Sequence, residues 1–213
     1  MSYYPCFISF RHFGDAISEA FIKQFFECLK GYLNPLVGKE PFIDFERMQP
    51  GYSLKPAIAD ALCKSACMIV IWSPQYFNEE QIWCAMEYKA MKELEKKRLG
   101  LLPNTENYKK LIIPVIYRGS KYYPSNLSQE TLYLNLEKFA LYEPPMAENK
   151  NFAAEIEKLA NYIYERIAVL KTLNNNQFGN CGDFGLPTNA DTLQFIQRLN
   201  QNIDEQEFPF RES

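Results

Sequence analysis

Short apolar runs alternate along this chain with longer stretches in which apolar residues recur every three or four positions. Short β-branched runs bounded by turn residues indicate buried strands, and the longer spacing indicates helices with one apolar face. We therefore expect strands at residues 5–10, 41–45, 68–72, 111–117 and 131–136. The helical spacing covers residues 16–33, 53–64, 80–97 and 152–170.

This alternation predicts an α/β fold with a parallel sheet and helices on both faces. Only the fourth connection, residues 118–129, is largely polar, and we expect a loop there. Such sheets bind ligands at the carboxyl ends of their strands, where the strand order changes direction. In a flavodoxin-like order this point lies between the first and third strands, so residues 10–15 and 73–78 would flank it.

One helical residue departs from the usual pattern of an exposed glutamate. Glu87 lies in the apolar stripe of the helix predicted at residues 80–97, whereas Glu93 has a lysine four positions away on each side. The residues three and four positions from Glu87 are Trp83, Cys84, Ala90 and Met91. A carboxylate in an apolar setting is either a costly buried group or part of a functional site.

Other polar and aromatic residues fall near the same predicted edge, each with an ordinary explanation. Arg11 follows the first strand, and Asp44 and Arg47 follow the second. They could be a surface cation, a turn cap and a solvated charge. Tyr76 and Trp83 come before Glu87, and aromatic residues at such spacing are more often core than ligand platforms.

Composition excludes several classes of protein. The chain is 47% hydrophobic and 23% charged, which is typical of a globular protein, and its net charge of −3 gives no general attraction to nucleic acid or anionic membranes. No apolar run approaches the roughly 20 residues of a membrane span, and no basic region precedes the first apolar run. We expect a cytoplasmic protein without nucleic-acid or membrane partners.

The cysteines and histidine argue against a disulfide framework and a metal site. The six cysteines are scattered and mostly lie in apolar segments, so free thiols in a reducing compartment are expected. Cys63 and Cys67 are four positions apart without further ligands nearby, and His12 is the only histidine. We therefore expect no metal. A phosphate-binding glycine loop is also absent.

Composition changes after residue 173. Residues 174–185 are polar and rich in glycine, which is typical of a linker, and residues 191–205 have helical spacing. We expect a domain at residues 1–172 and an extension at 173–213. The helix of the extension could dock on the domain, which is the simpler alternative, or bind a partner protein.

Taken in order, the motifs of residues 4–170 resemble the Toll/interleukin-1 receptor (TIR) domain. The main ones are Phe7-Ile8-Ser9-Phe10-Arg11-His12, Phe42-Ile43-Asp44, Pro50-Gly51, Ser73-Pro74-Gln75-Tyr76-Phe77 and Trp83-Cys84-Ala85-Met86-Glu87. Trp83 and Glu87 have the W-x-x-x-E spacing of the members that cleave NAD. In this respect the chain resembles the bacterial and defence-related branch more than an animal receptor adaptor.

The resemblance implies a three-layer, flavodoxin-like TIR fold with a five-stranded parallel sheet. It also implies cleavage of the bond between nicotinamide and ribose in NAD+, which is a substrate here, so no cofactor is expected. Glu87 matches the catalytic glutamate of the family, and residues 45–53 match the loop that governs self-association into head-to-tail oligomers. Our candidates for binding NAD+ are Phe10, Arg11, Asp44, Arg47, Ser73, Tyr76 and Trp83.

Three functions remain open at this point. The first is an NAD-cleaving enzyme of immunity, such as an antiphage effector, that depletes NAD or makes a cyclic nucleotide signal. The second is a non-catalytic scaffold that acts by contacts between TIR domains through residues 45–53. The third is a flavodoxin-like nucleotide-binding domain, which the missing phosphate loop disfavours.

Overall fold

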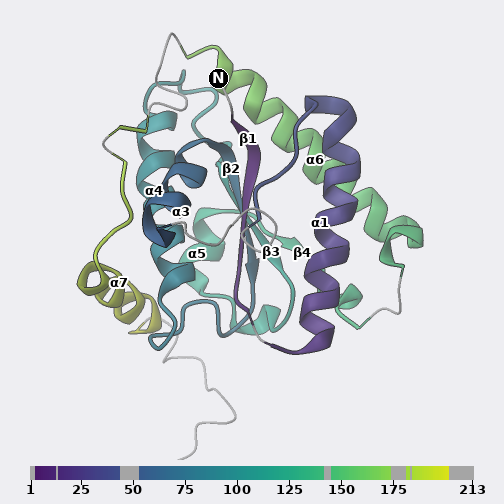
Figure 1. The fold of residues 1–213 in the computed structure, drawn as a ribbon, viewed down its shortest axis with the longest axis horizontal. Helices are drawn as coiled ribbons and strands as arrows, with labels where there is room; N and C mark the ends of the chain where they lie inside the picture. Colours follow the sequence, from purple (N-terminus) through teal and green to yellow (C-terminus); the bar gives the residue numbers. More distant parts are fainter. Residues whose placement is uncertain are drawn as a thin grey trace, which may run out of the picture.

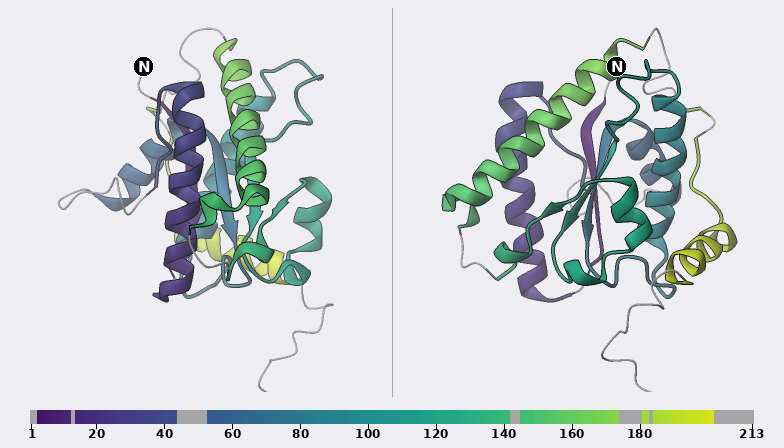
Figure 2. Two further views of the ribbon diagram at one scale, coloured as in Figure 1. Left: turned by 90° about the vertical axis from the view of Figure 1, so that its right-hand side faces the viewer. Right: turned by 180° about the vertical axis from the view of Figure 1, so that it is seen from behind.

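A parallel β-sheet forms the centre of the molecule, with helices on both faces (Figures 1 and 2). The computed structural model describes residues 3–12, 14–43, 53–141, 145–173, 181–182 and 184–201. Its strands are β1 (Tyr4–Phe10), β2 (Ser65–Trp72), β3 (Ile112–Ile116) and β4 (Leu134–Asn135). The predicted α/β class and parallel sheet are confirmed.

The strand order agrees with a flavodoxin-like sheet. The four strands lie in the order β1-β2-β3-β4, and every neighbouring pair is parallel. On the other side of β1, Phe42 forms an isolated bridge with Phe7, and its backbone accepts from Ile8 N at 2.9 Å and donates to Cys6 O at 2.8 Å. The predicted second strand therefore meets the first, although residues 44 and 45 lie outside the described part of the chain.

Two helical layers enclose the sheet. The helices are α1 (Ala16–Val37), α3 (Leu54–Cys63), α4 (Trp83–Leu99), α5 (Ser125–Glu130), α6 (Lys150–Lys171) and α7 (Asn189–Gln201). Short 3-10 turns occur at Ser120–Tyr122, Glu137–Phe139 and Met146–Glu148. Helices α1 and α6 cover one face, α3 and α4 cover the other, and α7 lies outside α4 (Figures 1 and 2).

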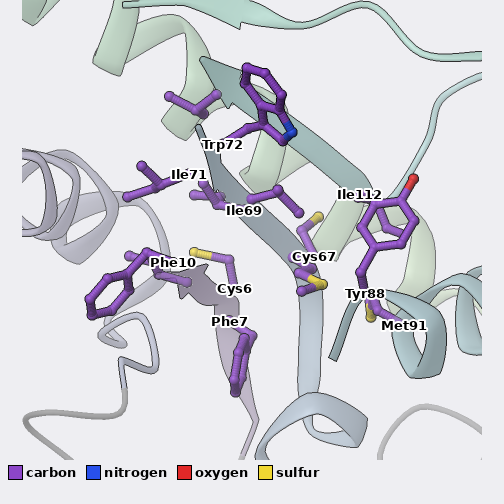
Figure 3. Packing of buried hydrophobic residues seen from close by; sticks show 14 of the residues in the cluster. Cys6, Phe7, Phe10, Cys67, Ile69, Ile71, Trp72, Tyr88, Met91 and Ile112 are labelled. Carbon is purple, nitrogen blue, oxygen red and sulfur yellow. The ribbon is translucent and has the colours of Figure 1, made fainter. Parts of the chain in front are cut away.

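Burial on both faces explains the apolar runs in the sequence. All eight residues of β2 are buried, so neither face of this strand needs the polar positions of a solvated sheet. Figure 3 shows Phe7, Phe10, Cys67 and Ile69 of neighbouring strands among the core side chains. Among the described residues, no helix combines the length and apolar character needed to cross a membrane.

The loop expected at residues 118–129 was predicted incorrectly. It contains the Ser120–Tyr122 turn and most of α5. Within α5 only Leu127 is buried, so this short helix offers no apolar stripe for periodicity to detect.

The prediction that all cysteines are free thiols is wrong for two of them. Cys63, at the end of α3, forms a disulfide with Cys181, and their Cα atoms are 5.8 Å apart. The other four cysteines, Cys6, Cys28, Cys67 and Cys84, keep their thiol groups. Since 118 positions separate the bonded pair, their proximity depends on how the C-terminal extension crosses the domain, which sequence spacing does not reveal.

The extension docks on the domain through α7, so the first alternative for its helix is the one observed. Phe195 lies 5.9 Å from the ring of Tyr88 in α4 and 6.0 Å from the ring of Phe77. Ile196 and Leu199 of the same helix are also buried. A partner protein for residues 173–213 stays a prediction.

Candidate active site

The predicted site residues that the structure describes belong to segments near the carboxyl ends of β1 and β2, at the lower edge of the sheet in Figure 1. Arg11 follows β1 directly, Ser73 and Tyr76 follow β2, and Trp83 and Glu87 lie in the first turns of α4. Because β1 and β2 are parallel neighbours, their carboxyl ends bring these segments together.

Glu87 is buried, as its apolar sequence neighbours indicated. Its side chain is 8% exposed, and Ser9 of β1 donates a hydrogen bond from Oγ to Glu87 Oε2 at 2.5 Å. Ser9 itself is 1% exposed. This short hydrogen bond offsets part of the cost of removing the polar carboxyl group from water.

Tyr76 contacts the same serine. Its hydroxyl lies 2.6 Å from Ser9 Oγ, and the whole side chain is inaccessible to solvent. Burial raises the pKa of Tyr76 well above its ordinary value, and the nearby Cys84 and Glu87 raise it further. The phenol is therefore neutral at physiological pH and keeps its proton.

The loop that carries Tyr76 is fixed to both neighbouring strand ends. Tyr76 N donates to Ser73 O at 2.9 Å, and Arg11 Nη1 donates to Gln75 O at 2.9 Å. Ser73 is buried, and its hydroxyl makes no hydrogen bond within the described residues. Arg11 thus holds this loop in place, which the sequence did not indicate.

The loop after β3 closes against the same segment. Gly119 has a φ of 71°, and a Cβ there would lie 2.6 Å from Pro74 Cγ, so only glycine fits this approach. Glu137 accepts hydrogen bonds from Gly119 N at 2.6 Å and from Ser120 Oγ at 2.5 Å. These contacts fix the loop after β2 in the position that places Tyr76.

Phe10 and Trp83 differ in their access to solvent. Phe10 is 8% exposed and its ring lies 4.5 Å from that of His12, whereas Trp83 is 36% exposed. Lys55 Nζ of α3 lies 6.0 Å from the Trp83 ring centroid. Cys84 Sγ donates to Phe10 O at 3.3 Å and ties the start of α4 to the end of β1. Trp83 is therefore an accessible aromatic surface beside the buried glutamate.

Part of the predicted site lies outside the residues that the structure describes. Asp44 and Arg47 lie outside the described residues, as does the loop at 45–53 except for Ser53. Among the residues that are described, no group of three or more His, Cys, Asp or Glu could hold a metal ion.

Ser9 is the member of this cluster that sequence reasoning missed. Ser9 belongs to the first motif of the TIR resemblance, Phe7-Ile8-Ser9-Phe10-Arg11-His12, but it is not among the candidate site residues from the sequence. A signal was present, because Ser9 is the one polar position in the run from Cys6 to Phe10. A hydroxyl inside the buried part of a strand needs hydrogen-bond partners, and here they are Glu87 and Tyr76.

The chain is similar to a family model and to a solved structure. A family model described as "TIR domain" matches residues 6–149. The fold is also similar to the TIR domains in a structure of the activated Roq1 resistosome directly recognizing the pathogen effector XopQ. That match has 19% identity and a TM-score of 0.39, and covers 92% of this chain and 98% of that chain. Among curated proteins, none matches.

Proposed function

This chain belongs to the TIR domain family, and we propose that it is an enzyme that cleaves the bond between nicotinamide and ribose in NAD+. The observation that carries the proposal is the buried carboxylate of Glu87. It lies at the carboxyl edge of the sheet, is oriented by Ser9, and follows the exposed Trp83 by one turn of α4.

The proposed chemistry needs one carboxylate. Nicotinamide leaves with the bonding electron pair as a neutral molecule, so its departure requires no general acid. The ribose acquires oxocarbenium character, as in glycoside hydrolysis. An ionised Glu87 stabilises this positive charge and binds the ribose hydroxyls, and its burial strengthens the interaction.

Other residues of the cluster would bind the rest of the substrate. Trp83 offers an exposed ring on which nicotinamide can stack. Arg11 can bind the diphosphate, for which a guanidinium has suitable geometry, and Phe10 would form part of the pocket wall. Asp44, Arg47 and Ser73 complete our set of candidates for binding NAD+. Tyr76, the remaining candidate from the sequence, is inaccessible to solvent, so it would act from behind the site and not by direct contact with the substrate. Attack on the ribose by water would give ADP-ribose, and attack by the adenine would give a cyclic product.

We place this activity in immunity, where the protein would deplete NAD+ or produce a signal after oligomerisation. The loop at residues 45–53 would make the contacts between subunits. Family membership supports this role, and the defence-type W-x-x-x-E spacing of Trp83 and Glu87 favours catalysis over a scaffold.

Nicotinamide release by the full chain at high concentration tests the proposal. We expect Glu87→Ala to lower the rate by about 100-fold or more, because a preorganised charge at the transition state is lost. Glu93→Ala is the matched control, since this glutamate is exposed on the same helix, and its rate should equal that of the wild type.

Two results would contradict the proposal in different ways. If Glu87→Ala releases nicotinamide at the wild-type rate, the protein is still an enzyme, but Glu87 is not its catalytic residue. No release by any of the proteins, even when crowding agents force assembly, would favour the scaffold. If release is observed, identification of the second product separates ADP-ribose from a cyclic form.

A further inference from the structure

Three buried polar side chains from distant parts of the sequence form one continuous hydrogen-bonded chain. Tyr76 OH lies 2.6 Å from Ser9 Oγ, and Ser9 Oγ lies 2.5 Å from Glu87 Oε2. The residues come from the loop after β2, from β1 and from α4, and none is more than 8% exposed. We call this set the hydroxyl chain.

The direction of the hydroxyl chain follows from the number of protons. Ser9 Oγ is the donor to Glu87 Oε2, and a serine hydroxyl has a single proton to donate. Ser9 then has only lone pairs for its second neighbour, and the hydroxyl of Tyr76 must be the donor. The raised pKa of Tyr76 keeps that proton in place.

The surroundings hold Tyr76 firmly enough for this role. Its ring packs edge-on against Phe77 at 4.9 Å, and Phe77 packs edge-on against Tyr88 at 5.3 Å. The backbone of Tyr76 closes a turn onto Ser73 O. A donor with so little freedom fixes the hydroxyl of Ser9, and consecutive hydrogen bonds polarise one another in a buried setting.

We infer that Ser9 and Tyr76 are positioning residues that orient the carboxylate of Glu87, with Tyr76 acting through Ser9. The inference rests on the proposed function of Glu87 and deepens it. Ser9 fixes Oε2, and this contact sets the plane in which the carboxylate meets the ribose. Neither hydroxyl needs to touch the substrate.

The test compares kcat and KM for NAD+ in four full-length proteins: the wild type, Ser9→Ala, Tyr76→Phe and the double variant. We expect Ser9→Ala to lower kcat by about 10- to 100-fold with little change in KM, as when an orienting partner of a site group is lost. Tyr76→Phe should lower kcat by a smaller factor. In the Ser9→Ala background, Tyr76→Phe should have no further effect, because its route to Glu87 is already broken.

Tyr88→Phe is the matched control. It also removes one hydroxyl from a buried ring in the same aromatic cluster, and it should leave kcat unchanged. Thermal unfolding of each variant shows whether a loss of rate reflects loss of folded protein. Two independent, multiplying effects of Ser9→Ala and Tyr76→Phe on kcat would overturn the inference, as would losses confined to KM.

A second readout keeps this inference separate from the proposed function. If the wild type releases no nicotinamide, the proposed function fails, and the catalytic role of the hydroxyl chain fails with it. The unfolding equilibrium constants of the same four proteins then test the hydrogen bonds alone. If the effect of the double variant on the unfolding equilibrium constant equals the product of the effects of Ser9→Ala and Tyr76→Phe, the two hydroxyls do not interact and the hydroxyl chain is not formed.

Discussion

At the scale of single residues, α4 carries two buried glutamates with different hydrogen-bond partners. Glu87 is 8% exposed and Glu95 is 5% exposed. Oε2 of Glu95 accepts hydrogen bonds from Leu111 N at 2.6 Å and Ile112 N at 2.9 Å, where β3 begins. Eight positions correspond to about 12 Å along a helix, which separates the two carboxylates toward opposite edges of the sheet.

The absence of basic neighbours identified only one of these two glutamates. Glu95 has Lys92 and Arg98 three positions away on either side, so the same argument would have placed it on the surface. The structure shows instead that Arg98 points into the protein, where it donates to Ser65 O at 2.6 Å and Cys63 O at 2.5 Å. A charge pattern along a helix thus gives possible pairs, and the tertiary contacts select among them.

We predict that Glu95→Ala lowers the free energy of unfolding by about 2–4 kcal/mol, because two buried N–H groups lose a charged acceptor. Urea denaturation measures this difference. Glu93→Ala, two positions earlier and exposed, should change it by less than about 0.5 kcal/mol. Equal denaturation midpoints for the two variants would contradict a structural role for Glu95.

At the scale of elements, a carboxylate from the Glu137–Phe139 turn holds the loop after β3. Glu137 accepts from Gly119 N, Ser120 N and Ser120 Oγ. The hydrogen bond from the Ser120 hydroxyl is the largest cause that lowers the pKa of Glu137, followed by the two backbone N–H groups. The turn therefore holds the loop that presses against Pro74.

This lowered pKa gives a pH dependence of stability with a definite sign. The folded state favours ionised Glu137, so its contribution is complete above the ordinary pKa of 4.5 and is lost as the pH falls through the lower, folded-state pKa. We predict that the stability difference between the wild type and Glu137→Gln is constant near neutrality and shrinks below about pH 4.5. Urea midpoints from pH 3 to 7 measure it, and a difference that grows in acid would refute the assignment.

At the scale of the whole molecule, the C-terminal extension is fastened to the domain at two places. One is the disulfide between Cys63 and Cys181, and the other is α7. Lys89 Nζ of α4 donates to Asp191 O at 3.3 Å, and Lys55 Nζ of α3 donates to Asn189 Oδ1 at 3.1 Å. The extension thus contacts the helix of Glu87 and the lysine that lies near Trp83.

A crosslink between residues 118 positions apart restricts the unfolded chain strongly. We predict that Cys181→Ser lowers the free energy of unfolding by about 3–5 kcal/mol without reductant. Cys28→Ser, which removes a free cysteine, should have a much smaller effect. Adding reductant to the wild type should reproduce the loss, whereas coincident urea curves for wild type and Cys181→Ser would show that the disulfide does not contribute.

The sequence by itself determined three of the strands, β1, β2 and β3, together with the main helices and the unusual position of Glu87. The strand predicted at residues 131–136 is a strand only at Leu134–Asn135, and the one predicted at 41–45 is described only as a bridge at Phe42, so the described part of the sheet has four strands and not five. A sheet covered on both faces requires apolar residues on both sides of each central strand, and a helix docked on it needs an apolar stripe. Both requirements leave local patterns. Helix ends were less certain: the apolar spacing of α1 stops at Leu33, while the helix continues through Pro35 to Val37 and ends at Gly38, whose φ is 66°.

Only the tertiary structure decided which residue orients Glu87, which cysteines bond, and where α7 lies. Ser9 and Glu87 are 78 positions apart, and Cys63 and Cys181 are 118 apart. Such contacts depend on strand order and register. The register of β1 against β2 pairs Ser9 with Val70, and this fixes the position of Ser9 along the sheet relative to α4. A one-residue slip would turn Ser9 to the opposite face of the sheet, because side chains alternate along a strand.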